Sequence, residues 1–171
     1  MAFSRVTSSV GDDTTCYDLF LSFRGEDTRD SFTDHLYHAL GQAGFLTFRD
    51  NDEIDRGQEL KPEIERAIKA SKASIVVLSL NYATSIWCLD ELWLILQQKR
   101  ERNHFVLPVF YHVDPSDVRN QEESFKIEVK IGTKWTDDNV KRWKVALTNI
   151  ANLTGFVLSG YVFSCSYLYF N

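Results

Sequence analysis

Cysteine, methionine and proline are scarce in this chain, with 3 Cys, 1 Met and 3 Pro among 171 residues. Cys16, Cys88 and Cys165 lie far apart, without a CxxC pair or the Cys/His spacing of a zinc site. This spacing argues against a disulfide-stapled scaffold and favours free thiols in a reducing cytosol.

Long apolar runs and an excess of positive charge are also missing. Residues 1–16 are rich in Ser and Thr and lack the apolar run of a secretory signal, so we predict a disordered leader there. No charged residue follows Lys144, but polar residues interrupt this stretch and no run of about 20 apolar residues could span a membrane. The net charge of -5 disfavours nucleic acid as the primary partner.

Metal and nucleotide motifs are absent as well. The four histidines are scattered, no HExxH spacing occurs, and neither GxxxxGK[ST] nor GxGxxG is found. We therefore predict no metal site and no resident cofactor.

The remaining composition, 44% hydrophobic and 25% charged, is that of one ordinary globular domain. Apolar, uncharged runs predict strands, which alternate with segments of helical periodicity. The predicted strands are 18–23, 45–49, 74–80, 105–111 and 155–158. The predicted helices include Phe32 to Leu40, one opened by Pro62, one over 85–102 and one around Trp143 to Ala151.

This alternation predicts right-handed βαβ crossovers and an α/β, flavodoxin-like fold, a mainly parallel sheet with helices on both faces. Two local features are less regular. Pro108 would normally place strand 105–111 at a sheet edge, and residues 112–123 read as a polar loop. Ligands of such folds sit at the carboxyl ends of the strands near the switch point, which directs interest to loops 24–28 and 80–85.

Four blocks in these segments resemble the plant-type Toll and interleukin-receptor (TIR) domain. They are YDLFLSFRGEDTR (17–29), FTDHLYHAL (32–40), NYATSIWCLDEL (81–92) and VLPVFYHVDPSDVR (106–119). The resemblance implies a TIR domain over 17–158, a sheet of order 2-1-3-4-5, a cytoplasmic location and a role in plant innate immunity. Many such domains, once self-associated, hydrolyse the nicotinamide-ribose bond of NAD. The family's catalytic glutamate falls in its WCLxEL block, which assigns that role to Glu91 and makes NAD the substrate.

The chemistry agrees with a single carboxylate. Nicotinamide is attached in NAD as a cationic pyridinium and departs as a neutral base, so its departure needs no general acid. A fixed negative charge would stabilise the oxocarbenium-like ribose that remains. Glu91 could supply that charge, or act as a base or transient nucleophile. On a helix from Ser85, the side chains of Trp87, Cys88 and Glu91 share one edge.

Phe23, Arg24 and Gly25 end the first strand and are candidate substrate-binding residues. Gly25 would let the backbone approach a ligand, and Arg24 offers a planar fork for phosphate or ribose oxygens. The structural alternative for Arg24 is an ion pair with Glu26 or Asp27.

Trp87 and Ser85 complete the predicted substrate site. Trp87 either stacks on a substrate ring or packs against the sheet, and Ser85 either contacts a ribose hydroxyl or caps the helix.

Self-association is assigned by the resemblance to two places. The loop with Ile54, Arg56 and Gly57 resembles one that contacts neighbouring protomers, and otherwise is a charged surface loop. His35 stands where the family often has a Ser-His pair, here Asp34-His35.

The C-terminal segment departs from the family. Residues 159–171 are uncharged and aromatic where a charged amphipathic helix is usual, so we predict that the last helix is missing or replaced. The chain would then be a TIR-only or truncated resistance-type protein. Two functions stay open: a self-association-dependent NAD glycohydrolase, or a noncatalytic adaptor or decoy that binds other TIR proteins, full-length resistance proteins included.

Overall fold

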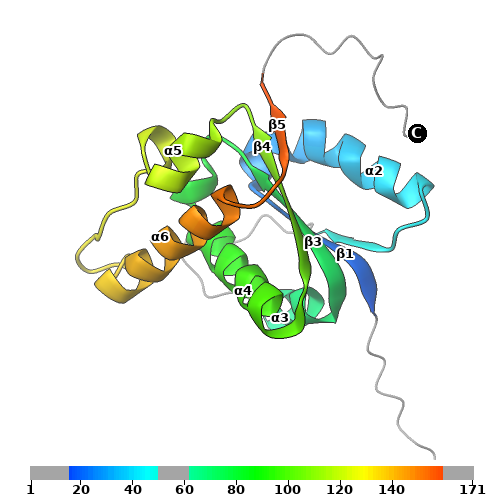
Figure 1. Cartoon of the computed structure of the whole chain (residues 1–171), viewed down its shortest axis with the longest axis horizontal. Helices are drawn as coiled ribbons and strands as arrows, with labels where there is room; N and C mark the ends of the chain where they lie inside the picture. The colour runs from blue at the N-terminus through cyan, green and yellow to red at the C-terminus, as the bar shows by residue number, and fades with distance from the viewer. Residues whose placement is uncertain (1–15, 50–61, 160–171) are drawn as a thin grey trace, which may run out of the picture.

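The computed structural model describes residues 16–49 and 62–159, which form a five-stranded sheet with helices on both faces (Figure 1). The strand order is β2-β1-β3-β4-β5, and all four pairings are parallel. This confirms the predicted flavodoxin-like class and order. The strands are β1 (Tyr17–Phe23), β2 (Thr47–Arg49), β3 (Ser71–Leu78), β4 (Phe105–Tyr111) and β5 (Phe156–Leu158).

Helices connect the strands in the predicted places, and further helical segments follow β1 and β4. The predicted helix over Phe32 to Leu40 is preceded by a short helix and a π-helical turn. The backbone leaves helical geometry at Ser31, before the regular helix starts. The helices are α1 (Gly25–Thr28), α2 (Asp34–Gln42), α3 (Pro62–Ala70), α4 (Ile86–Arg102), α5 (Pro115–Asn120) and α6 (Asp137–Ala151). The short turns are η1 (Arg29–Thr33), η2 (Tyr82–Thr84) and η3 (Glu123–Phe125).

The two faces of the sheet bury separate apolar cores. Successive residues of a strand point to opposite faces, so Phe20 packs with residues of α3, α4 and α6, whereas Leu21 and Phe23 pack toward α2. Figure 1 shows α2 on the other side of the sheet from α3, α4 and α6. Ser22 has the parity of Phe20 and therefore faces the α4 side.

Strand β4 is not at an edge, which corrects the expectation drawn from Pro108. It pairs with β3 on one side and β5 on the other, but the pairing with β5 begins at Val109. The Pro108 carbonyl oxygen lies against Gly155, where an added Cβ would come within 2.3 Å of it. Since the N and C=O of a strand residue point the same way, the missing N–H of Pro108 faces a place where β5 has not yet begun to pair.

The predicted polar loop over 112–123 is also corrected, because it contains α5. Asp114 caps this helix by accepting from the Ser116 amide at 2.7 Å, and Pro115 occupies its first turn. Elsewhere β2 is shorter than predicted and leaves Phe45 and Leu46 exposed, and β3 ends at Leu78, so the loop after it begins at Ser79.

The predicted leader and aromatic tail lie outside the described residues, apart from Cys16 and Ser159. The same holds for the predicted loss of the last helix. Among the helices of residues 16–49 and 62–159, none is long and apolar enough to cross a bilayer.

Candidate functional site

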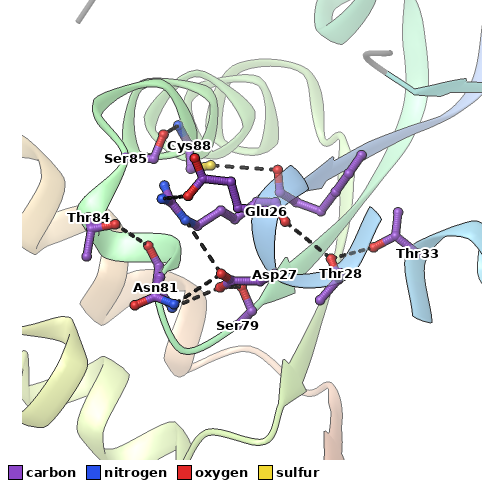
Figure 2. A network of polar contacts seen from close by, with 11 residues as sticks. Glu26, Asp27, Thr28, Thr33, Ser79, Asn81, Thr84, Ser85 and Cys88 are labelled. Atoms are coloured by element: carbon purple, nitrogen blue, oxygen red, sulfur yellow. Dashed lines mark hydrogen bonds and ion pairs between the residues drawn. The ribbon is translucent and has the colours of Figure 1, made fainter. Parts of the chain in front are cut away.

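Two loops meet at the carboxyl ends of β1 and β3, and Asp27 of α1 joins them. The Asp27 Oδ2 atom accepts from the Ser79 hydroxyl at 2.5 Å and from the Asn81 amide at 2.9 Å, and Oδ1 accepts from Asn81 Nδ2 at 3.1 Å. Figure 2 shows the Asp27 carboxylate directed at these two residues. The loops that the sequence singled out are thus bound to each other.

Glu91 of α4 lies inside the molecule beside this junction, with 3% of its surface exposed. Its Oε2 atom accepts from the Ser22 hydroxyl at 2.6 Å, and its Oε1 atom accepts from the Trp87 indole N–H at 2.7 Å. A charged carboxylate is expensive to bury unless donors hold it, and here a donor contacts each oxygen. These contacts give the Glu91 carboxyl group a defined position near the end of β1.

A second layer of polar groups lies behind Glu91. The Tyr82 hydroxyl is 3.0 Å from both Ser22 Oγ and the Cys88 carbonyl oxygen, and its single proton is shared between these two acceptors. Burial, followed by the nearby Cys88 and Glu91, raises the pKa of Tyr82 well above its usual value. Burial and Glu91 also raise the pKa of the Cys88 thiol to about 12. Both groups therefore stay protonated near neutral pH, and the Cys88 thiol is not a nucleophile there.

The end of β1 holds three of the five residues predicted to bind substrate. Arg24 forms ion pairs with Glu26 at 2.5 Å and with Asp27 at 3.6 Å, so the structural alternative for Arg24 is present. Its Nε atom is buried and has no hydrogen-bond partner in the described part of the chain. Gly25 leaves room for the Arg29 guanidinium, which an added Cβ would meet at 2.8 Å. Phe23 is buried in the core that faces α2, away from the face that carries Ser22.

Ser85 and Trp87 lie at the start of α4. Ser85 caps the helix, with its hydroxyl oxygen accepting from the Cys88 amide at 3.3 Å, as one of the two sequence readings proposed (Figure 2). Trp87 is half-buried and directs its indole N–H at Glu91 rather than only packing against the sheet. The helical spacing predicted that Trp87 and Glu91 lie on one edge of the helix, and their hydrogen bond agrees with this.

The predicted self-association residues are only partly described. His35 is exposed on α2, next to Asp34, which accepts from Arg49 Nη1 at 2.9 Å. Ile54, Arg56 and Gly57 lie outside the described residues. Over residues 16–49 and 62–159, no group of three or more His, Cys, Asp or Glu side chains could hold a metal ion.

Sequence reasoning missed the roles of Ser22, Tyr82 and Asp27 at this site. Ser22 was detectable, because it is a lone hydroxyl within the otherwise apolar run LFLSF and must be bonded if that strand is buried. Tyr82 and Asp27 gave no comparable signal, since their partners come from segments distant in sequence.

The fold and the site define a flavodoxin-like α/β domain with a buried glutamate at the carboxyl edge of its sheet. The family model of the TIR domain matches residues 16–162. The chain belongs to the TIR domain family, as its sequence blocks indicated.

Plant disease-resistance proteins are among the relatives of this chain. The chain is 53% identical over 145 residues to disease resistance protein RPV1 of Vitis rotundifolia, covering 85% of this chain and 10% of that protein. It is 48% identical over 153 residues to the TMV resistance protein N of Nicotiana glutinosa, covering 88% of this chain and 13% of that protein. The chain thus spans roughly a tenth of the length of these relatives.

A solved structure with the same fold is that of the TIR domains of the activated Roq1 resistosome, which directly recognizes the pathogen effector XopQ. The TM-score is 0.72 at 46% identity, and the match covers 83% of this chain and 87% of that chain. This agreement supports the arrangement of strands and helices described above.

Proposed function

We propose that this chain is a cytoplasmic NAD glycohydrolase that acts after self-association and signals in plant innate immunity. Membership of the TIR family and similarity to plant disease-resistance proteins support the immune role. NAD is the substrate and no resident cofactor is required.

The observation that carries the proposal is the placement of Glu91. The residue that the family motif designates is buried, held through both oxygens, and located beside the loop that follows β1. An ordinary glutamate in the first turns of a surface helix would instead extend into water. A glutamate that is desolvated and hydrogen-bonded is typical of a functional carboxylate.

The reaction breaks the bond between C1′ of the ribose and the pyridinium nitrogen. The bonding electron pair goes to that nitrogen, neutral nicotinamide leaves, water attacks the cationic ribose carbon, and the water proton passes to solvent. Because donors already hold both oxygens of Glu91, its geometry favours electrostatic stabilisation of the ribose cation over nucleophilic attack.

Substrate binding is assigned to the loops that surround Glu91. Arg24 would bind the diphosphate or ribose oxygens after exchanging its contacts with Glu26 and Asp27. Trp87 would offer its ring face to the nicotinamide while its N–H holds Glu91. Gly25 and the carbonyl of Phe23 contribute backbone rather than side-chain surface.

Self-association would use the exposed His35 face of α2 together with the segment of Ile54, Arg56 and Gly57. The partners are other copies of the chain or other TIR domains. A steep dependence of activity on protein concentration is the expected signature.

The test is the release of nicotinamide from NAD, measured against protein concentration for the parent, Glu91→Gln and Glu101→Gln. Glu101 is an exposed glutamate at the other end of α4 and serves as the matched control. We expect activity in the parent and control that rises faster than linearly, and a loss of at least about 100-fold in Glu91→Gln. Equal turnover in all three proteins would move catalysis away from Glu91.

A noncatalytic adaptor or decoy is the second candidate, and the state of Arg24 favours it. The guanidinium that should receive substrate is already paired with two carboxylates. This function predicts binding to other TIR domains with no nicotinamide release at any protein concentration.

A further inference from the structure

Ser22 occupies an unusual place for a hydroxyl group. It is the penultimate residue of β1, wholly buried, on the face of the sheet that α4 covers. Burying a hydroxyl among apolar side chains is unfavourable unless it is hydrogen-bonded. Phe20, the nearest residue of matching parity in the strand, is apolar and wholly buried, so burying the serine beside it has a cost that its contacts must offset.

The contacts of Ser22 lead directly to the candidate catalytic group. Its hydroxyl donates to Glu91 Oε2 at 2.6 Å, and its oxygen is 3.0 Å from the Tyr82 hydroxyl. Hydrogen bonds from a hydroxyl to an ionised carboxylate are short and about twice as strong as neutral ones. Because Ser22 gives its own proton to Glu91, Tyr82 is the donor in their mutual contact, and this bond restricts the rotation of Ser22 Oγ.

The donors on the two oxygens of Glu91 come from different elements. Trp87 lies one turn earlier on the same helix and moves with Glu91 when α4 moves. Ser22 belongs to β1, the strand that continues into the Arg24 loop. The Ser22 bond therefore fixes the carboxylate relative to the part of the sheet where the substrate would bind.

We propose that Ser22 is a positioning residue that fixes the orientation of the Glu91 carboxylate and favours its ionised form, with Tyr82 orienting the Ser22 hydroxyl. The catalytic consequence rests on the proposed function, whereas the effect on the Glu91 carboxyl does not. Ser22 touches neither substrate nor the reacting atoms, and acts through Glu91.

The first experiment compares the parent chain with Ser22→Ala, Ser22→Thr and the control Ser74→Ala. Ser74 is a fully buried serine of β3 whose hydroxyl contacts His104 at 2.8 Å, so its replacement removes a similar bond away from Glu91. We expect Ser22→Ala to lower kcat by about 10- to 100-fold with little change in KM, and to shift the acidic limb of the pH profile upward by about one unit. Ser22→Thr keeps the hydroxyl and should restore both, and Ser74→Ala should alter neither.

The second experiment does not need turnover. The carboxyl carbon of Glu91, assigned by its loss in Glu91→Gln, is titrated by 13C NMR in the parent and the variants. Removing the donor should raise the midpoint in Ser22→Ala, and Tyr82→Phe should raise it by a smaller amount.

The outcomes separate the two proposals. If the parent releases no nicotinamide but the titration midpoint of Glu91 rises in Ser22→Ala, the proposed function is wrong and the positioning role of Ser22 is supported. Should Ser22→Ala not fold, the midpoints of Ser22→Thr and Tyr82→Phe decide. Unchanged midpoints in every folded variant, or a kcat loss that Ser74→Ala reproduces, would overturn the assignment of Ser22.

Discussion

Replacing Asp27 by alanine tests whether the two loops of the site are held together as the structure indicates. Asp27 accepts three hydrogen bonds from Ser79 and Asn81. Its carboxylate also lies 3.6 Å from Arg24 Nε. The alanine variant removes every one of these contacts and leaves the donors to find water.

The expected cost follows from the number and type of these bonds. A hydrogen bond to a charged group contributes about 1.5–3 kcal/mol, but bonds that share one acceptor are not additive and water can replace part of them. We expect Asp27→Ala to lower the free energy of unfolding by about 2–3 kcal/mol and Tm by about 4–12 °C. Asp27→Asn keeps one acceptor oxygen without the charge and should cost about half as much.

Urea unfolding gives the free energy, and amide hydrogen exchange locates the effect. The Asn81 amide, which donates to Asp27, should exchange faster in the variant. The exchange rates of amides in the centre of β3 should change only as much as the global free energy of unfolding requires. Asp30→Ala, at an exposed position in the following turn, is the control and should change stability by less than about 0.5 kcal/mol. If the Asp27→Ala and Asp30→Ala variants have equal stability and the exchange of the Asn81 amide is unchanged, Asp27 does not hold the two loops together.

Two further predictions concern the frame around the site. Gly155→Ala places a Cβ 2.3 Å from the Pro108 carbonyl oxygen and should lower the free energy of unfolding by about 1–3 kcal/mol. Gly41→Ala in α2 meets no atom within 4 Å and should raise the free energy of unfolding by about 0.5–1 kcal/mol. Thermal melts in which both variants shift Tm in the same direction would contradict this. Burial lowers the pKa of His104, so its neutral form is favoured in the folded state, and the associated stability is complete above pH about 6.5 and declines as the pH falls toward the folded pKa. Between pH 7.5 and pH 5.5, the free energy of unfolding measured in urea should fall more in the parent than in His104→Asn. Equal decreases in the two proteins would exclude His104 as the cause.

Much of the frame could be read from residue patterns. The run over 74–80 is β-branched, uncharged and bounded by polar residues, which predicted a strand there because such residues suit a pleated sheet, and β3 lies at this place. Ser85 before an apolar helical repeat indicated the start of α4, and the structure has its cap there. Where local rules failed, a distant segment was responsible: Pro108 is tolerated inside the sheet because the segment facing its missing N–H, at Gly155, lies before the pairing of β4 with β5 begins.

The sequence alone predicted the alternating strands and the longer helices, since these depend on local periodicity, and a family motif within one helix identified Glu91 as the candidate catalytic residue. Only the tertiary structure decided which donors hold that carboxylate. Ser22 and Glu91 are 69 positions apart, and their contact requires β1 and α4 to pack at one register. Side-chain spacing along a helix or strand is set by local geometry, but hydrogen bonds between elements depend on how those elements pack, which no single segment encodes.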